Sequence, residues 1–252
     1  MARLADLVDW CDRYLAVSDF TDYAPNGLQV AGPEQVQRVV SGVTASQALI
    51  DGAADRGADL LVVHHGFFWK GEDPRVVGMK YRRLSRLLEA GIGLLAYHLP
   101  LDAHAEVGNA VGLGRALGWQ VEGPFAERNG GPLGRVGSLT EPCSGEELAA
   151  SLGAVLGRPP LHIRGHDRPI RRLAWATGAA EGFIEEAADR GMDAFVSGEI
   201  SEPTVHIARE CGIDYFAAGH HATETFGPHA LARRLAEEFD LDHEFLDVDS
   251  PA

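Results

Sequence analysis

Cysteine is scarce in this chain of 252 residues. Cys11, Cys143 and Cys211 are the only three, and they lie far apart without forming a CxxC pair. This spacing excludes a disulfide framework and a zinc site built from thiolates. Because free thiols persist in reducing compartments, we expect a cytoplasmic protein.

Basic side chains are also in short supply. The 22 lysines and arginines face 37 acidic residues, which leaves a net charge of −15. Most of such a surface repels a phosphate backbone, so nucleic acid is an unlikely partner. One basic run stands out, and we interpret it as a solvated helix face. It comprises Lys70, Arg75, Lys80, Arg82, Arg83 and Arg86.

Long apolar runs are absent, and no stretch is long enough to cross a bilayer, so we expect no membrane partner. The N-terminus lacks the basic start and apolar core of a signal peptide. Residues 1–15 instead place Leu4, Leu7, Val8, Cys11 and Leu15 on one face of an amphipathic helix. Hydrophobic residues make up 45% and charged residues 23% of the chain, as in globular proteins with one large or two small domains.

Several motifs that would name a substrate or a nucleophile are missing. There is no Walker-type GxxxxGK[ST], no GxGxxG after a strand and no GxSxG elbow. Covalent catalysis is therefore the weaker alternative. Residues 108–112 open an expected helix, which either binds a phosphate or carboxylate at its amides or simply packs through small side chains.

A repeated unit dominates what is present. The sequence AADRG occurs at residues 53–57 and again at 187–191, each time at the end of an alanine-rich helical pattern. The glycine ends the helix, and a short apolar strand follows, at 59–63 in one copy and 193–197 in the other. The copies indicate two related α/β halves.

Two further segments follow the same outline of helix, glycine and strand. Residues 88–91 lead into a strand at 92–97, and residues 209–212 lead into a strand at 213–218. Alternating helices and apolar strands predict an α/β fold with mostly parallel sheets covered on both faces. The middle differs: residues 123–142 form either a linker or a hairpin, Ser144 and Glu147 form a capping box, and 162–175 supply two more strands.

Metal-ligand side chains follow these strands. Because open α/β sheets bind ligands beyond the carboxyl ends of their strands, we expect these residues to converge. They are His64 and His65 after the first strand, His98 and Asp102 after the second, Glu199 after the third, and His220 and Glu224 after the fourth. Imidazoles and carboxylates without thiolate suit zinc, manganese, iron, nickel or cobalt.

Each of these residues also has an ordinary explanation. A single histidine is more often a core or surface residue than a ligand, and a carboxylate four residues after a histidine is common by chance. The combination of His98 with Asp102 and of His220 with Glu224 fits one helix face or a tight turn. The combined set exceeds what one catalytic zinc ion uses, and two ions bridged by a carboxylate would employ it fully.

The motifs HHGFFW, YHLPLDAHAEVGN, SGEISEPTVH and AGHHATETFG resemble those of the NGG-one-interacting-factor-three-like proteins, whose bacterial members are called YbgI-like or GTP cyclohydrolase I type 2 homologs. The resemblance covers nearly the whole chain, and Asn26-Gly27-Leu28 fits the opening motif. It implies two interlinked α/β domains, one made of residues 1–123 plus 213–252 and the other inserted at 124–212. It also implies a homohexameric toroid with a dinuclear metal centre facing its interior.

The resemblance further implies a ligand set of His64, His65, Asp102, His220 and Glu224, with Glu224 as the bridging carboxylate. His98 and Glu199 match residues near the site and are candidate catalytic proton carriers. His104, His221 and His206 do not match ligand positions.

Three functional hypotheses remain open from the sequence. The first is a hydrolase that uses two divalent ions on a small nucleotide-like or pterin-like molecule. The second is a non-enzymatic metal-binding protein for storage, delivery or insertion. The third is a scaffold with a vestigial site, which the intact ligand set disfavours.

Overall fold

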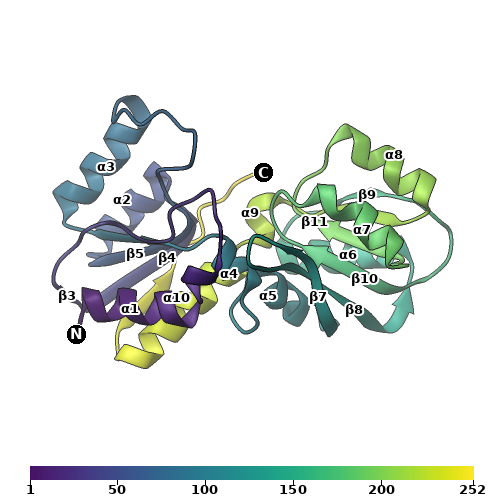
Figure 1. The fold of residues 1–252 in the computed structure, drawn as a ribbon, viewed down its shortest axis with the longest axis horizontal. Coiled ribbons are helices and arrows are strands. Elements are labelled where there is room, and N and C mark those ends of the chain that lie inside the picture. The colour runs from purple at the N-terminus through teal and green to yellow at the C-terminus, as the bar shows by residue number, and fades with distance from the viewer. The chain divides into compact units, whose positions relative to one another are not determined.

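The computed structural model describes residues 1–252, which pack into two units, each built around its own β-sheet (Figure 1). The first unit contains residues 1–101 and 227–249, and the second contains residues 102–226 and 250–252. The C-terminal stretch completes the first unit, so the two α/β units are interlinked along the chain. The expected domain boundaries at 123/124 and 212/213 stay a prediction.

The first unit has a five-stranded sheet in the order β13-β4-β5-β6-β2. Neighbouring strands are parallel except at the β2 edge, where β2 runs antiparallel to β6. The strands of this sheet are β2 (Gly27–Val30), β4 (Arg38–Thr44), β5 (Leu60–His65), β6 (Gly93–Ala96) and β13 (Asp242–Phe245). A separate antiparallel pair joins β1 (Ala2–Arg3) to β3 (Gln35–Val36).

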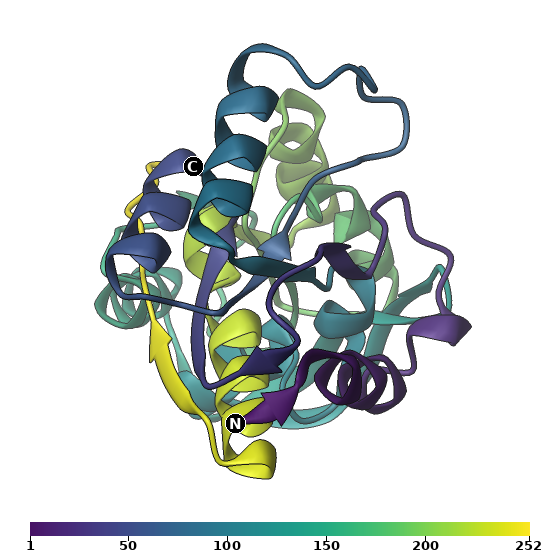
Figure 2. The ribbon, with the colours of Figure 1, turned by 90° about the vertical axis from the view of Figure 1, so that its left-hand side faces the viewer.

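Helices cover both faces of this sheet. Figures 1 and 2 place α2 and α3 on one face and α1 and α10 on the other. Their bounds are α1 (Leu4–Tyr14), α2 (Gln47–Asp55), α3 (Gly78–Ala90) and α10 (Phe226–Phe239), with a 3-10 turn at Val17–Asp19. Val40, Leu61 and Val63 pack under α2 and α3 in a fully buried cluster. Each such side chain contributes about 1.5–3 kcal/mol by burial.

The second unit has a six-stranded sheet in the order β7-β8-β10-β11-β12-β9. Only β10, β11 and β12 are parallel neighbours, so this sheet is mixed rather than mostly parallel. Its strands are β7 (Gln120–Arg128), β8 (Gly131–Cys143), β9 (Leu161–Ile163), β10 (Ile170–Ala176), β11 (Ala194–Ser197) and β12 (Asp214–Ala217). Its helices are α4 (Leu99–Ala103), which spans the boundary between the units, α5 (Asn109–Ala116), α6 (Gly145–Leu156), α7 (Ile184–Asp189), α8 (Glu202–Cys211) and α9 (His220–Thr223), with a 3-10 turn at Glu181–Phe183.

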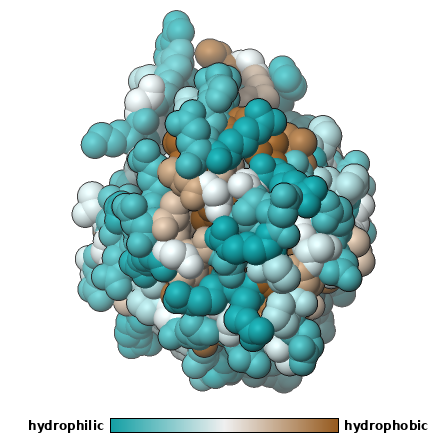
Figure 3. Space-filling model, turned by 90° about the vertical axis from the view of Figure 1, so that its right-hand side faces the viewer, coloured by the Kyte–Doolittle hydropathy of each residue, from teal (hydrophilic) through white to brown (hydrophobic).

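Each face of this second sheet packs against its own apolar cluster. Trp175 and Phe216 pack with α5 and α6 on one side, while Phe195 and Tyr215 pack with α7 and α8 on the other. The outer surface seen in Figure 3 is largely hydrophilic, with brown visible mainly in gaps between hydrophilic side chains. No helix of the chain combines the length and apolar character that a membrane span requires.

The middle of the chain adopts structures that its sequence motifs predict. Residues 123–142 form most of the β7–β8 hairpin, so the hairpin alternative is the correct one. Ser144 caps α6, with the reciprocal contacts of a capping box to Glu147. The stretch 162–175 contributes to two strands, as predicted.

The repeat is present in three dimensions. Asp59 accepts hydrogen bonds from the amides of residues 37 and 38 at 2.8 and 2.9 Å, just before β5. Asp193 does the same for residues 171 and 172 at 3.0 and 2.9 Å, just before β11. Gly57 and Gly191 both adopt positive φ, at +63° and +67°, which glycine tolerates without strain. The two AADRG segments therefore perform the same structural task in each sheet.

Candidate metal centre

The first unit brings three histidines together at the carboxyl ends of β5 and β6. His64 and His65 are the last residues of β5, and His98 follows β6. Nitrogen atoms of the three rings lie within 4.8 Å of one another. His64 and His98 are only 1% and 7% exposed. The apolar run of β5 places His64 and His65 at the carboxyl edge of the sheet, where we expected a ligand site.

Hydrogen bonds orient two of these rings. His64 Nδ1 lies 2.9 Å from the carbonyl oxygen of Tyr97 and donates to it. The other nitrogen, Nε2, is then the unprotonated one that a metal ion requires. His65 Nδ1 lies 3.1 Å from the hydroxyl of Thr44, at the end of β4.

His98 is held by a carboxylate that the sequence did not reveal. Its Nδ1 lies 3.0 and 3.2 Å from the two oxygens of Asp22, and its backbone amide donates to Asn26 at 2.7 Å. Burial of Asp22 raises the pKa of its carboxyl group, but the hydrogen bond and charge of His98, with donors from Asn26 and Ala24, outweigh this and leave the pKa at about 2. Asp22 is therefore ionised and fixes the orientation of His98.

The second unit contributes a histidine and a glutamate from one turn. His220 begins α9, and Glu224 follows its last residue. This short helix places His220 Nε2 3.1 Å from a Glu224 oxygen, so the predicted spacing of four residues does bring the side chains together. On the far side of the ring, His220 Nδ1 lies 2.6 Å from Glu199. Burial lowers the pKa of His220, but Glu224 and Glu199 outweigh it and raise the pKa to about 9.

Asp102 belongs to the same unit and is 8% exposed. The side-chain amide of Asn109 donates to it at 2.8 Å, and the Thr177 hydroxyl donates at 3.4 Å. A carboxylate oxygen of Asp102 lies within 4.8 Å of one of Glu224. Two buried carboxylates this close repel each other, so they favour a cation between them.

A glycine shapes the space around Glu224. Gly178 has φ +64°, and a Cβ atom there would lie 2.1 Å from a Glu224 oxygen and 3.1 Å from His220 Nε2. Its amide donates to the Thr223 hydroxyl at 3.2 Å. Neither Gly178 nor Thr223 was predicted, because each acts through residues remote in the sequence or through backbone contacts.

Residues outside the predicted ligand set have structural contacts. His104 Nδ1 accepts the amides of Glu106 and Val107 at 3.2 Å each. His206 lies on the surface of α8 and pairs with Glu202 at 2.8 Å. Neither histidine belongs to the groups of close ligand atoms.

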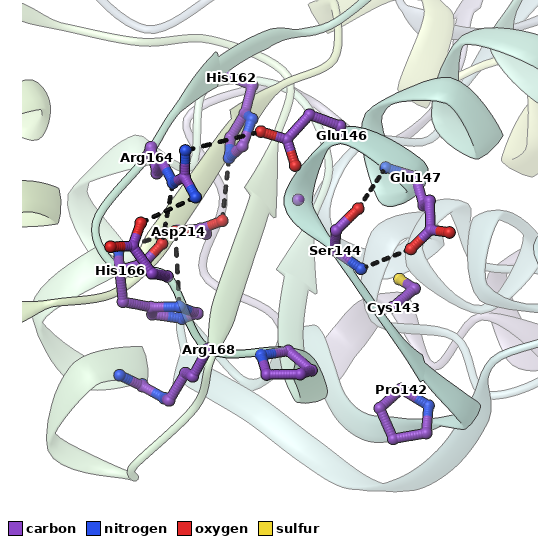
Figure 4. Close-up of a pocket in the computed structure, with 13 residues that line it drawn as sticks. Pro142, Cys143, Ser144, Glu146, Glu147, His162, Arg164, His166, Arg168 and Asp214 are labelled. Atoms are coloured by element: carbon purple, nitrogen blue, oxygen red, sulfur yellow. Dashed lines mark hydrogen bonds and ion pairs between the residues drawn. The ribbon is translucent and has the colours of Figure 1, made fainter.

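An open pocket of about 310 Å³ in the second unit lies apart from these ligands (Figure 4). Asp214 holds its wall together: it is 2.9 Å from His162 Nε2 and accepts the amides of Gly165 and His166 at 2.8 and 3.2 Å. These contacts lower the pKa of Asp214 despite its burial. His162 also stacks on Phe216 with ring centroids 4.4 Å apart. The network pins the β9 edge to β12.

The guanidinium groups at this pocket are neutralised within the chain. Arg164 pairs with Asp167 at 2.8 Å, and Arg168 pairs with Asp193 at 3.1 Å. The pocket therefore offers no excess positive charge to an anion.

Comparison with known proteins identifies the family of this chain. The family described as Duf34/NIF3 (NGG1p interacting factor 3) matches residues 2–251. A protein of Pseudomonas aeruginosa named GTP cyclohydrolase 1 type 2 homolog is 54% identical over 249 residues, which cover 99% of this chain and 98% of the relative. The protein of the same name from Escherichia coli K12 is 52% identical over 234 residues, or 92% of each chain.

Solved structures share the fold over the full length. The protein ybgI, described as of unknown function, superposes with a TM-score of 0.95 at 48% identity and covers 100% of both chains. A protein from Thermus thermophilus has a TM-score of 0.88 at 36% identity, again over 100% of both chains. With a family match along almost its entire length and these relatives, the chain belongs to the Duf34/NIF3 family.

Proposed function

We propose that this chain is a metal-dependent hydrolase whose ligands are His64, His65, Asp102, His220 and Glu224. The observation that carries the proposal is the chemistry of the two donor sets. One unit presents clustered imidazoles, and the other presents a histidine between two glutamates with a buried aspartate close by. Such donors without thiolate suit two divalent ions of zinc, manganese, iron, nickel or cobalt.

The hydrogen bonds of several donors orient them as metal ligands would be oriented. The Tyr97 carbonyl takes the proton of His64 Nδ1, which makes Nε2 the nitrogen suited to a metal ion. The Glu199 carboxylate makes a hydrogen bond with Nδ1 of His220. A carboxylate in this position orients an imidazole whose other nitrogen binds a metal ion. Gly178 leaves Glu224 the room that a bridging carboxylate needs.

Two bound ions would lower the pKa of water and polarise the bond to be cleaved. The chain's own residues would position the reacting water and transfer its protons. Asp22 holds His98 beside His64 and His65, and Glu199 is half exposed next to His220. We propose His98 and Glu199 as the groups that carry protons to and from the reacting water.

The substrate proposal rests on the relatives' names. Because proteins about half identical to this chain are named GTP cyclohydrolase 1 type 2 homologs, we propose a small nucleotide-like or pterin-like substrate. We further propose a homohexameric ring in the cytoplasm, where the three free cysteines remain reduced. Light scattering that gives a stable monomer at micromolar concentration would refute the assembly.

The test is a screen of metal-loaded protein against nucleotides, phosphoesters and cyclic amides, with metal content measured in parallel. We expect close to two ions per chain and turnover of at least one class of substrate. His64→Ala and Glu224→Ala should lose both the bound metal and the turnover. His206→Ala, on the surface of α8, is the matched control and should keep both.

Two outcomes contradict the proposal. Turnover that survives both ligand substitutions and chelation would mean that the activity does not depend on the metal. Tight binding of two ions with no turnover in the screen would favour the carrier alternative, a protein for metal storage, delivery or insertion.

A further inference from the structure

Two aromatic rings lie against the histidine donors of the first unit. The ring centroid of Trp69 is 5.8 Å from that of His65 and 5.2 Å from that of His98. The Tyr23 ring is 5.0 Å from His98 and 5.6 Å from Trp69. Tyr23 belongs to the loop before β2, and Trp69 belongs to the loop after β5. We call Tyr23 and Trp69 the aromatic wall.

Hydrogen bonds fix the two loops that carry this wall. The amide of Lys70 donates to the carbonyl of Tyr23 at 2.7 Å, which joins the loops beside both rings. The amide of Phe67 donates to the side chain of Gln29 at 2.6 Å. A Cβ atom on Gly66 would lie 2.2 Å from the same Gln29 oxygen, so this close approach requires glycine. The wall is therefore preorganised, which reduces the entropy that binding a ligand costs.

The turn that presents Trp69 has a strained backbone. Phe67 packs into the core and is 6% exposed, whereas the next residue, Phe68, is 39% exposed and has a φ of +66°. A bulky side chain in this left-handed region is uncommon, because its Cβ atom crowds the backbone. Strain of this kind persists where the surrounding structure enforces it, and it concentrates at binding sites and active sites. The turn is thus favoured as part of a functional site.

The wall offers a ligand ring surface more than polar groups. The indole N–H of Trp69 already donates to the carbonyl of Gly66 at 3.2 Å. The Tyr23 hydroxyl lies 3.5 Å from Nε2 of His98. Tyr23 is nevertheless 51% exposed, and Trp69 is partly exposed. Much of what a ligand can contact here is therefore the two aromatic rings.

We propose that the aromatic wall binds the fused heteroaromatic ring of the substrate by stacking. The inference rests on the proposed hydrolase and adds the part of the site that recognises the ring. Tyr23 and Trp69 stand at 74° and 82° to the His98 ring, so a planar group stacked parallel to them is steeply inclined to that imidazole. A ring in this position lies beside His65, a proposed metal ligand, and His98, a proposed proton carrier.

Charge and shape select this class of ligand. Cations also bind to the faces of aromatic rings, but a divalent ion held by His65 would repel them. An aliphatic group could cover the wall, but it would lack the preferred geometry of contacts between aromatic rings. A purine-type or pterin-type ring is neutral, flat and large enough to cover an indole. Because every such ring has a π face, stacking is tolerant of its identity, and a purine nucleotide can report it.

A matched pair of ligands tests the wall. Guanosine monophosphate and ribose phosphate share the sugar and the phosphate and differ only in the ring. We would measure the affinity of the metal-loaded protein for each by isothermal titration calorimetry. We expect the wild type to prefer guanosine monophosphate by about tenfold or more, and Trp69→Ala and Tyr23→Ala to lose most of this preference. Their affinity for ribose phosphate should stay unchanged, which checks that the variants are folded.

Conservative substitutions separate the rings from other effects. Trp69→Phe retains an aromatic face and should keep much of the preference. Tyr23→Phe removes only the hydroxyl group and should keep all of it. Trp10→Ala is the control, because Trp10 is also a partly exposed tryptophan of the first unit but stacks on Tyr14 at 4.6 Å. This variant should show the preference of the wild type.

Fluorescence reports the stacking contact directly. Trp119 and Trp175 are only 7% and 0% exposed, so a ligand in solution does not reach their rings. Guanosine monophosphate should quench the tryptophan emission of the wild type and of Trp10→Ala. It should produce little quenching in Trp69→Phe, although this variant still binds the nucleotide. Ribose phosphate, which has no ring to stack, should quench none of these proteins.

The outcomes distinguish the wall from the hydrolase. Equal affinity of the wild type for the two ligands, or an unchanged preference in both Trp69→Ala and Tyr23→Ala, would overturn the wall and leave the hydrolase proposal standing. Quenching that persists in Trp69→Phe would also count against it. A ring preference that depends on Trp69 and Tyr23, without turnover of any class in the substrate screen, would support the wall and overturn the hydrolase.

Discussion

At the scale of single residues, the absence of a side chain at Gly178 leaves room for the carboxylate of Glu224. Its Cβ position lies 2.1 Å from the Glu224 carboxylate, so Gly178→Ala must displace Glu224 or shift the backbone. The alanine would also sit at φ +64°, which costs about 1 kcal/mol on its own. We expect this variant to lose most of its bound metal, as measured by elemental analysis after dialysis against a trace of chelator.

Gly191→Ala separates these two effects. Gly191 has φ +67° and no atom within 4 Å of its Cβ position, so it carries the backbone strain without the clash. Gly191→Ala should lose only the stability that the backbone strain costs, and it should keep its metal. Equal metal content in the two variants would show that the space beside Glu224 is unimportant for binding.

Asp22 and Asp214 serve their units in similar ways. Each is an ionised carboxylate that accepts hydrogen bonds from backbone amides and from a histidine ring nitrogen. Only Asp22 does so beside the candidate ligands, through His98. A histidine with an aspartate partner therefore does not by itself indicate a functional site in this chain.

At the scale of elements, β13 depends on a neutral histidine. His243 Nε2 lies 2.8 Å from the hydroxyl of Ser41 in β4, the strand that β13 pairs with. Burial lowers its pKa to about 4, helped by the charges of His229 and Arg233 against the opposing effect of Glu244. The ordinary value is about 6.5, so the unfolded chain binds this proton first as the pH falls.

The stability contributed by neutral His243 is therefore full above about pH 6.5 and is lost as the pH falls toward about 4. Because the ring is partly exposed, solvent screening reduces the effect to the order of 1 kcal/mol. Urea unfolding of metal-free protein at pH 7.5 and pH 5 should show this loss in the wild type and less of it in His243→Gln. An identical pH dependence in both proteins would contradict the assignment.

At the scale of the whole molecule, bound ions should add to the free energy of unfolding. Ligand present at 100 times its dissociation constant stabilises a folded protein by about 2.7 kcal/mol. For a chain of this length, each kcal/mol raises the melting temperature by about 2–4 °C. We therefore expect chelation to lower the wild-type melting temperature by several degrees.

The same chelation should have little effect on Glu224→Ala, since a chain that has already lost its ions has none to give up. Scanning calorimetry of both proteins with and without chelator measures the difference. A chelator-induced shift of equal size in the two proteins would mean that the stabilising ions bind elsewhere.

Much of this protein follows from its sequence, because the signals involved are local. The AADRG segments predict where a helix ends and a strand begins, and both copies adopt the same turn. The Ser144 capping box predicts the start of α6. The ligand-type residues were recognisable because apolar strands lead directly into them, and motif order along the whole chain indicated the family.

The tertiary structure decided what depends on contacts between remote segments. Asp22 reaches His98 across 76 residues, and Gly178 meets the Thr223 hydroxyl across 45. The same applies to strand partners: β12 joins the six-stranded sheet beside β11 and β9, and β13 adds to the sheet of the first unit. A periodic pattern specifies that a strand is buried but not which neighbour pairs with it. That choice is made only when the whole chain packs its apolar faces together.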